Sequence, residues 1–287
     1  MAETGGPAPR QRHPRVNLDR DAVRTIHGDV EVLVWSPVRA NSPSPWVLAM
    51  HGGGFVVGSA LGAERLAVPL AAEYGIVTVS VEYSLAPEAR APRAAEECWG
   101  VLRAVQRTGR VAGVQVNPDL VAVHGSSAGA SLAAGLALRS RDEGVILQLQ
   151  SLGCPALDHV SWATEDSSHS MWGYAPTWSR AATSAVWDHY LGPQANPSPY
   201  VVPALAGDMS GVAPAHLLLA QFDVLRDEGW EYAVRLRDAG IPVTVDAPPG
   251  TVHGFEGLLP DSAVSRRALA AQALALARSL RRVPPEG

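Results

Sequence analysis

The segment Leu120-Val121-Ala122-Val123-His124-Gly125-Ser126-Ser127-Ala128-Gly129 decides the fold of this 287-residue chain. An apolar strand leads into a G-x-S-x-G turn, and the alanine- and leucine-rich residues that follow predict a helix over residues 128–139. Such a turn exposes its central serine in a strained conformation, and the flanking glycines avoid a collision across the turn. A glycine-rich helix entry without chemistry is the alternative, but the strand–turn–helix context favours Ser127 as a nucleophile.

Strands and helices alternate on both sides of this segment. Short β-branched runs predict strands over residues 30–35, 46–50, 76–82, 120–124, 146–152, 216–221 and 243–247. Helical patterns cover residues 64–73, 94–106, 128–139, 227–238 and 265–282. Several strands are apolar on both faces, as strands covered by helices on two sides must be. The alternation predicts an α/β fold with a mostly parallel sheet, in one domain over residues 1–287.

A base and an acid are expected to follow the nucleophile, because a serine hydroxyl needs a neighbouring base at neutral pH. With a turn of this kind the chain order is serine, acid, histidine. Asp223 comes directly after the apolar strand 216–221, and His253 is the one histidine beyond it, in a loop after strand 243–247. Asp246 is the second candidate for the acid, but it lies within a strand. We therefore expect Asp223 to orient His253.

A glycine run, His51-Gly52-Gly53-Gly54, follows the strand over residues 46–50. Consecutive glycines let backbone N–H groups approach a ligand closely, and such donors stabilise a tetrahedral oxyanion. The sequence predicts Gly53, Gly54 and Ala128 as these donors and indicates a structural role for His51. A phosphate-binding loop is the rival interpretation, but no lysine follows the glycines.

Aromatic residues crowd the stretch from Asp158 to Gly192, which has no clear strand and holds four of the eight tryptophans. We expect this insertion to fold over the sheet as a cap, although a helical hairpin packed by tryptophan also fits. The candidate pocket residues are Phe55, Trp162, Trp172, Trp178 and Phe255.

Composition argues against several other classes of protein. The formal net charge is −5 without basic clustering, which disfavours a nucleic-acid or anionic-membrane surface. No long apolar run predicts a membrane span, and the polar first 21 residues lack a signal-peptide core, so a cytoplasmic location is expected. Cys98 and Cys154 lie in apolar surroundings far apart in the chain, so buried free thiols are expected, with a disulfide as the alternative. No histidine–carboxylate cluster has metal-ligand spacing, so no metal is expected.

Five motifs together resemble the bacterial hormone-sensitive-lipase-like esterases. They are HGGGFV at 51–56, EYSLAPE at 82–88, GSSAG at 125–129, DVLRDEG at 223–229 and HGF at 253–255, in the family's order. The resemblance covers most of the chain from about Val30 onward. It implies an eight-stranded α/β-hydrolase core with helices on both faces, a cap over the acyl site, no cofactor, and carboxylesterase activity on short to medium acyl esters.

The chain also departs from this family. Ser126 stands where an aspartate is usual, and Ser84 stands where an arginine is usual. Only 50 residues precede His51, so the N-terminal part of the cap is expected to be small and the insertion at 158–192 to form most of it. An open, tryptophan-lined pocket would suit a bulky or aromatic substrate.

Three rivals to a carboxylesterase differ in chemistry or in class. An amide or N-acetyl hydrolase would use the same residues, and the sequence does not separate it from an esterase. A ligand-binding homologue without catalysis should have lost a member of the triad, yet Ser127, Asp223 and His253 are all present. A metal hydrolase is disfavoured for want of ligands. The expected partner is a small-molecule ester, and an exposed edge strand near the C-terminal end of the sheet leaves a homodimer open.

Overall fold

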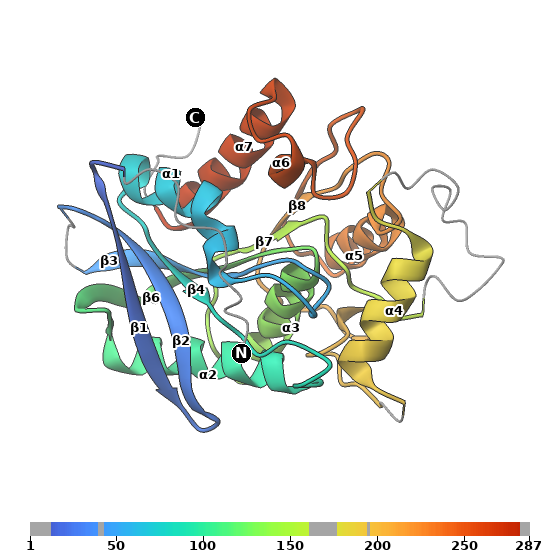
Figure 1. Cartoon of the computed structure of the whole chain (residues 1–287), viewed down its shortest axis with the longest axis horizontal. Helices are drawn as coiled ribbons and strands as arrows, with labels where there is room; N and C mark the ends of the chain where they lie inside the picture. The colour runs from blue at the N-terminus through green and yellow to red at the C-terminus, as the bar shows by residue number, and fades with distance from the viewer. Residues whose placement is uncertain (1–12, 40–42, 161–176, 194–195, 282–287) are drawn as a thin grey trace, which may run out of the picture.

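A computed structural model describes residues 13–39, 43–160, 177–193 and 196–281 of the chain (Figure 1). The strands are β1 (Val16–Thr25), β2 (Gly28–Pro37), β3 (Ser44–Met50), β4 (Val77–Val81), β5 (Arg110–Val111), β6 (Val114–Ser126), β7 (Gln150–Gly153), β8 (Ala215–Leu218) and β9 (Val243–Asp246). The helices are α1 (Glu64–Tyr74), α2 (Arg93–Thr108), α3 (Ala128–Asp142), α4 (Arg180–Leu191), α5 (Arg226–Asp238), α6 (Phe255–Leu258) and α7 (Ala263–Ser279), with short 3₁₀ turns at Ala60–Ala63 and Pro203–Leu205.

The strands form one sheet in the order β1-β2-β4-β3-β6-β7-β8-β9, and the two-residue β5 pairs with β6 beside this path. Strands β1, β2 and β4 pair antiparallel, whereas every pairing from β4 through β3 to β9 is parallel. The predicted mostly parallel sheet is therefore confirmed. Because parallel strands share a direction, the loops after β3, β6, β8 and β9 all meet at the carboxyl edge of the sheet.

Helices cover both faces of the sheet, and successive residues of the central strands point to opposite faces. Val47 of β3 packs with Leu70 of α1 and Leu276 of α7 in one cluster, whereas Leu48 belongs to the cluster that includes Leu102 of α2 and Leu136 of α3. Figure 1 shows α1 and α7 on one side of the sheet and α2 and α3 on the other. Burial of a side chain of this size contributes about 1.5–3 kcal/mol, so the two layers fix the sheet that carries the site.

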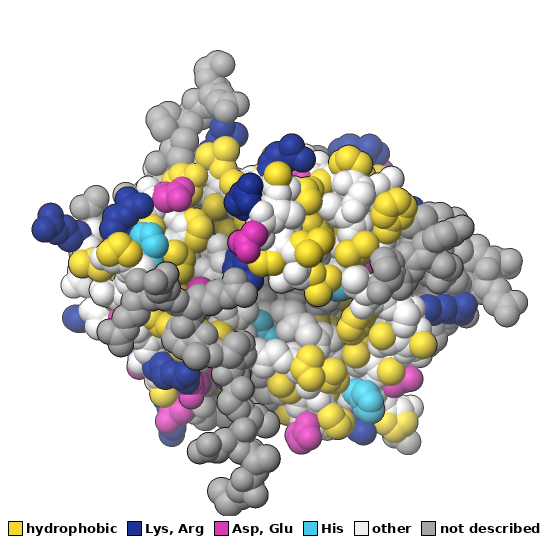
Figure 2. All heavy atoms as spheres, turned by 45° about the horizontal axis from the view of Figure 1, so that its top comes forward, with side chains coloured by type: hydrophobic (Ala, Val, Ile, Leu, Met, Phe, Trp, Pro, Cys, Tyr) yellow, Lys and Arg dark blue, Asp and Glu magenta, His cyan; other side chains and the backbone are white. Residues whose placement is uncertain are grey.

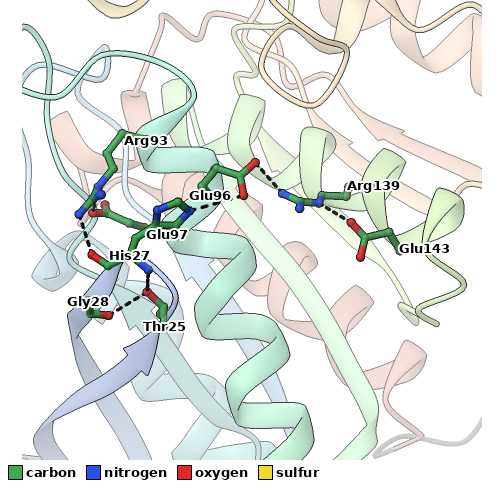
Figure 3. A network of polar contacts seen from close by, with 8 residues as sticks. All are labelled: Thr25, His27, Gly28, Arg93, Glu96, Glu97, Arg139 and Glu143. Atoms are coloured by element: carbon green, nitrogen blue, oxygen red, sulfur yellow. Dashed lines mark hydrogen bonds and ion pairs between the residues drawn. The ribbon is translucent and has the colours of Figure 1, made fainter.

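A network of polar contacts ties α2 to the first hairpin (Figure 3), and hydrogen bonds from Ser84 to Glu97 extend it to the loop after β4. Arg93 donates to the buried carboxylate of Glu97 at 2.6 Å and to the His27 carbonyl at 3.0 Å. The same carboxylate accepts the Ser84 backbone N–H at 2.7 Å and its hydroxyl at 2.8 Å. Arg93 thus supplies a guanidinium next to Ser84, the position where the resembling family usually has an arginine. The network fixes the loop that reaches the glycine run, because Ala86 donates to the Phe55 carbonyl at 2.8 Å.

Helix α4 is the helix within the described part of the aromatic insertion, residues 158–160 and 177–192. Trp187 and Tyr190 of α4 pack against Phe55, with ring centroids 5.1 Å and 3.9 Å away. The helix therefore lies over the glycine run, where a cap was expected. Residues 161–176 and 1–12, and with them Trp162, Trp172 and the beginning of the N-terminal arm, lie outside the described residues.

The sequence analysis predicted a surface without basic clustering and two buried free cysteines. In Figure 2 charged side chains of both signs are scattered among hydrophobic ones, and the described residues form no single basic patch on that face. Within the described ranges, no helix is both long and apolar enough to cross a membrane. Cys98 and Cys154 are both free and buried, as predicted.

Candidate active site

Ser127 lies at the tip of the turn between β6 and α3, in a backbone conformation of φ 54° and ψ −119°. A side chain at Gly125 would come within 2.0 Å of the Gly129 carbonyl oxygen, and one at Gly129 within 2.2 Å of the Met50 carbonyl oxygen. No residue except glycine fits either position. The Ser127 N–H donates to the Gly153 carbonyl at 2.7 Å, which ties the strained residue to β7. The turn therefore has the predicted geometry, with Ser127 at the amino end of α3.

His253 and Asp223 complete a continuous chain of hydrogen bonds from Ser127. Ser127 Oγ lies 2.9 Å from His253 Nε2, and His253 Nδ1 lies 2.7 Å from Asp223 Oδ2. The Asp223 side chain is fully buried, and the His253 side chain is 10% exposed. The second carboxylate oxygen, Oδ1, accepts the Leu225 N–H at 3.0 Å, which fixes the plane of the carboxylate. All three residues predicted from the sequence are thus brought together.

The loops that carry the acid and the base are joined one residue before each of them. Phe222 forms an isolated parallel bridge with Val252, and its N–H donates to the Thr251 carbonyl at 2.8 Å. Asp223 and His253 are the next residues in their loops. A short extension of the β8–β9 pairing therefore sets the register between the two side chains.

Asp246, the second candidate for the acid, has a different partner. Its Oδ2 lies 3.0 Å from Nε2 of His216, within the pairing of β8 and β9. Burial lowers the pKa of His216, although the Asp246 carboxylate acts in the opposite direction. Asp246 is therefore engaged with His216, and Asp223 alone of the two contacts His253.

The electrostatic balance around His253 favours its protonated form. Burial lowers the pKa of His253, but the charge and hydrogen bond of Asp223, together with the charge of Glu256, outweigh burial and raise the pKa above its ordinary value. A carboxylate that accepts the Nδ1–H also fixes the tautomer, leaving Nε2 free to take a proton from the serine. The arrangement can therefore perform general-base chemistry at Ser127.

The glycine run bends sharply after β3 and faces the turn that holds Ser127. Gly53 has φ 120°, and a side chain there would come within 2.0 Å of the Val57 carbonyl oxygen. Gly54 has φ 62°, and a side chain there would lie 2.7 Å from Val186 of α4. The N–H groups of Gly53, Gly54 and Ala128 donate to no acceptor among the described residues.

His51, at the beginning of this run, is buried and stacks on Tyr83, with ring centroids 4.1 Å apart. The Tyr83 hydroxyl donates to the His51 carbonyl at 2.7 Å. Burial lowers the pKa of His51 to about 4. A neutral, packed imidazole agrees with the structural role expected for this residue.

A cavity of about 500 Å³ opens at Ser127. Trp178 lines it, with its ring centroid 5.6 Å from that of His253, as the sequence predicted. The pocket assignments of Phe55 and Phe255 are corrected by the structure: both are almost fully buried, Phe55 against α4 and Phe255 against α7 and Leu218. The remaining wall includes residues that the sequence did not single out, namely Gly62, Ala63, Arg65, Leu66, Gly153, Thr177, Glu256, Gly257, Leu258, Leu269 and Gln272.

Among the described residues that line the cavity, Glu256 is the one carboxylate. Its position in the sequence is a weak signal that it lies near His253. It stands three residues after His253, a spacing that places two side chains on one face of a helical turn. The spacing alone did not reveal a contact with the serine turn, because that contact depends on how α6 docks.

Cys154, Asp223 and His253 form one group of donors within the described residues that is close enough for a metal ion, with ligand atoms within 4.8 Å of one another. Asp223 and His253 are already bonded to each other. Burial raises the pKa of the Cys154 thiol well above its ordinary value, so the thiol stays protonated and is a poor metal ligand. The donor set suits proton transfer better than metal binding.

Known proteins resemble this chain in sequence and in fold. The model of the alpha/beta hydrolase fold family matches residues 47–257. Esterase LipI of Mycobacterium tuberculosis is 34% identical over 259 residues, covering 87% of this chain and 78% of that protein. The structure of a bacterial heroin esterase superposes with a TM-score of 0.86 at 35% identity, covering 93% of this chain and 86% of that one. Esterase LipW from Mycobacterium marinum gives a TM-score of 0.84 at 34% identity, over 92% and 82% of the two chains.

The family match spans the glycine run, the serine turn, and the loops of Asp223 and His253. The family resemblance drawn from the five motifs is therefore confirmed, and the chain belongs to the α/β-hydrolase family, in its hormone-sensitive-lipase-like branch.

Proposed function

We propose that this protein is a serine carboxylic ester hydrolase, with Ser127 as nucleophile, His253 as general base and Asp223 as the acid that orients it. The observation that carries the proposal is the unbroken chain of contacts from Ser127 Oγ to His253 at 2.9 Å and on to Asp223 at 2.7 Å, at the end of an open cavity. The names of the relatives, an esterase and a carboxylesterase of Mycobacterium tuberculosis among them, support an ester over an amide as the substrate.

The geometry supports acylation of Ser127 as the first step. His253 Nε2 takes the hydroxyl proton while Ser127 Oγ forms a bond to the ester carbonyl carbon, and the carbonyl π electrons move onto its oxygen. The bond between carbon and alkoxy oxygen then breaks, and the proton passes from Nε2 to the departing alcohol. A water that His253 deprotonates hydrolyses the acyl-enzyme by the same two proton transfers and returns Ser127 to its free form.

The developing oxyanion would be held by three backbone N–H groups. The N–H groups of Gly53, Gly54 and Ala128 have no acceptor among the described residues. Gly53 and Gly54 line the cavity together with Ser127, and Ala128 is the next residue after Ser127. The amino end of α3 also favours negative charge at this point. Preorganised donors of this kind are each worth about two to three powers of ten in rate.

The size of the cavity supports a small-molecule substrate. A volume of about 500 Å³ lies within the range of pockets that enclose ligands of ordinary drug size. Its wall combines backbone glycines with Trp178, Leu66, Leu258 and Leu269. We therefore propose short to medium acyl esters as the substrate class.

Hydrolysis of p-nitrophenyl esters from acetate to laurate tests the proposal directly. Wild-type protein should hydrolyse the shorter esters, and Ser127→Ala should lower kcat by at least about a thousandfold, because the nucleophile is lost. Ser210→Ala, an exposed serine far from the cavity, is the matched control and should retain full activity. Folded wild-type protein that hydrolyses no ester, but cleaves a matched acetanilide, would replace the proposal with an amide hydrolase.

A further inference from the structure

Glu256 on α6 connects the helix after His253 to the residue before the nucleophile. Ser126 Oγ donates to Glu256 Oε1 at 3.4 Å, a contact between residues 130 positions apart. Ser126 adjoins Ser127, and Glu256 lies three residues after His253. The carboxylate therefore spans the two segments that hold the serine and the base.

This carboxylate is poorly compensated where it lies. Glu256 Oε2 is buried and has no hydrogen-bond partner among the described residues, and the same holds for Gln272 Nε2 of α7. Ser126 and Gln272 both lie next to Gly153. A Cβ atom at Gly153 would be 3.7 Å from Ser126 Oγ and 3.3 Å from Gln272 Nε2. Because a buried oxygen without a partner costs stability, packing alone favours a neutral side chain at position 256. A carboxyl group kept at this position against stability suggests a role in the chemistry.

Several titratable groups face His253 and Glu256 from the surrounding elements. Asp223 lies on the loop after β8, Cys154 follows β7, His124 belongs to β6, and Arg65 of α1 lines the same cavity. Burial lowers the pKa of His124 to about 4 and raises that of Cys154 well above its ordinary value, so both are neutral near pH 7. Of the described carboxylates, Asp223 and Glu256 are the two whose charge raises the pKa of His253.

The coupling between Glu256 and His253 acts in both directions. Burial raises the pKa of Glu256 above its ordinary value, although its own backbone N–H, the charge of protonated His253 and the Ser126 hydroxyl act in the opposite direction. The glutamate is thus held most firmly in its ionised form when His253 carries a proton, which is the state that forms during acylation.

We propose that Glu256 is a positioning residue for the general base: held against the serine turn by Ser126, its carboxylate stabilises the imidazolium that His253 becomes while Ser127 is acylated. The inference rests on the proposed function, since it takes His253 as the base. Asp223 fixes the imidazole from Nδ1, and Glu256 adds a second negative charge from the side of α6.

The test is the pH dependence of kcat/KM for wild-type protein, Glu256→Gln, Glu256→Asp and Glu231→Gln. Without the charge, the pKa of His253 should fall, so the acid limb of Glu256→Gln should move to lower pH by on the order of one unit. Its plateau kcat should fall about three- to tenfold, since the imidazolium is less stabilised. Glu256→Asp keeps the charge and should keep the acid limb of the wild type. Glu231 is exposed on α5, so Glu231→Gln should match the wild type in both respects.

A lower kcat in Glu256→Gln with an unmoved acid limb would show a merely structural role and overturn the proposal. Glu256→Met is a second neutral variant, for use if the glutamine variant does not fold. The pH dependence of Ser127 labelling by a fluorophosphonate gives an independent readout. Wild-type protein that is labelled but hydrolyses no ester would contradict the proposed function. In that case the pH dependence of labelling in wild-type protein and Glu256→Gln would still test the role of Glu256. Wild-type protein that is neither labelled nor active would overturn both.

Discussion

At the scale of single residues, Asp223 and Asp246 offer a direct comparison of two carboxylates that each contact a histidine. Asp223 Oδ2 lies 2.7 Å from His253, and Asp246 Oδ2 lies 3.0 Å from His216. Asp223→Asn should lower kcat by about 10⁴-fold, because an asparagine there favours the wrong tautomer of His253. Asp246→Asn should leave kcat within about twofold of the wild type, since Asp246 does not touch the reacting groups. Steady-state hydrolysis of p-nitrophenyl butyrate measures both, and comparable losses in the two variants would contradict the assignment.

The sequence predicted which three residues the structure brings into contact, because their order and local context are both restrictive. Ser127 stands in a turn that needs glycines on either side, and His253 is the one histidine beyond Asp223. The contact of Ser126 with Glu256 could not be predicted, because it depends on how α6 docks against the serine turn. Phe55 and Phe255 were assigned to the pocket because they adjoin site motifs, but an aromatic side chain serves a core equally well. Only the packing of α4 and α7 decides between these roles.

At the scale of helices and strands, the central elements were predictable and the first strand was not. The interior strands are buried on both faces and therefore read as continuous apolar runs. Strand β1 has no such run: it is an edge strand, carries Asp19, Arg20 and Asp21, and alternates between half-buried and exposed residues. It is held by its hairpin with β2, and this pairing is not visible in its own hydrophobicity.

The α2 network makes a prediction at this scale (Figure 3). Arg93 is 41% exposed, but the Glu97 side chain that it pairs with is only 4% exposed. Arg93→Met would leave this carboxylate without its cation, so we expect a loss of about 1–3 kcal/mol in the free energy of unfolding, discounted for the exposure of the arginine. Arg20→Met breaks the exposed pair with Glu31 and should cost less than about 0.5 kcal/mol.

Urea unfolding followed by circular dichroism measures both variants at one pH and salt concentration. Equal shifts of the unfolding midpoint in the two variants would mean that Arg93 contributes no more to the free energy of unfolding than the exposed Arg20. A larger shift for Arg93→Met would support the network as the anchor of the loop at Ser84.

At the scale of the whole molecule, buried histidines couple folding to pH. His51 and His124 are 4% and 7% exposed, and burial lowers the pKa of each from 6.5 to about 4. Burial lowers the pKa of His216 as well. In the unfolded chain these imidazoles take up protons as the pH falls through 6.5, whereas in the folded protein His51 and His124 stay neutral until about pH 4. The contribution of these neutral histidines to the free energy of unfolding is therefore present above their unfolded pKa. It is lost as the pH falls towards their folded pKa.

Two other groups of side chains act with the opposite sign. The pKa of His253 is raised, so its contribution is present below its unfolded pKa and is lost as the pH rises through its folded pKa. Burial likewise raises the pKa values of Glu82 and Glu256, and these carboxyls favour the folded state as they become protonated. The histidines with lowered pKa values act together between pH 6.5 and about 4, so we expect acid to destabilise the protein in this window.

His124→Gln isolates one of these contributions. Each histidine with a lowered pKa should decrease the free energy of unfolding by about 1.4 kcal/mol per pH unit once the pH is well below 6.5. Glutamine does not titrate, yet it can still bond the Ser151 hydroxyl that His124 contacts at 3.1 Å. The variant should therefore lose stability between pH 6 and pH 5 less steeply than the wild type, by about that amount per unit, whatever its stability at pH 7. Urea unfolding at pH 7, 6 and 5 gives the two slopes, and parallel slopes would show that His124 is already protonated in the folded protein.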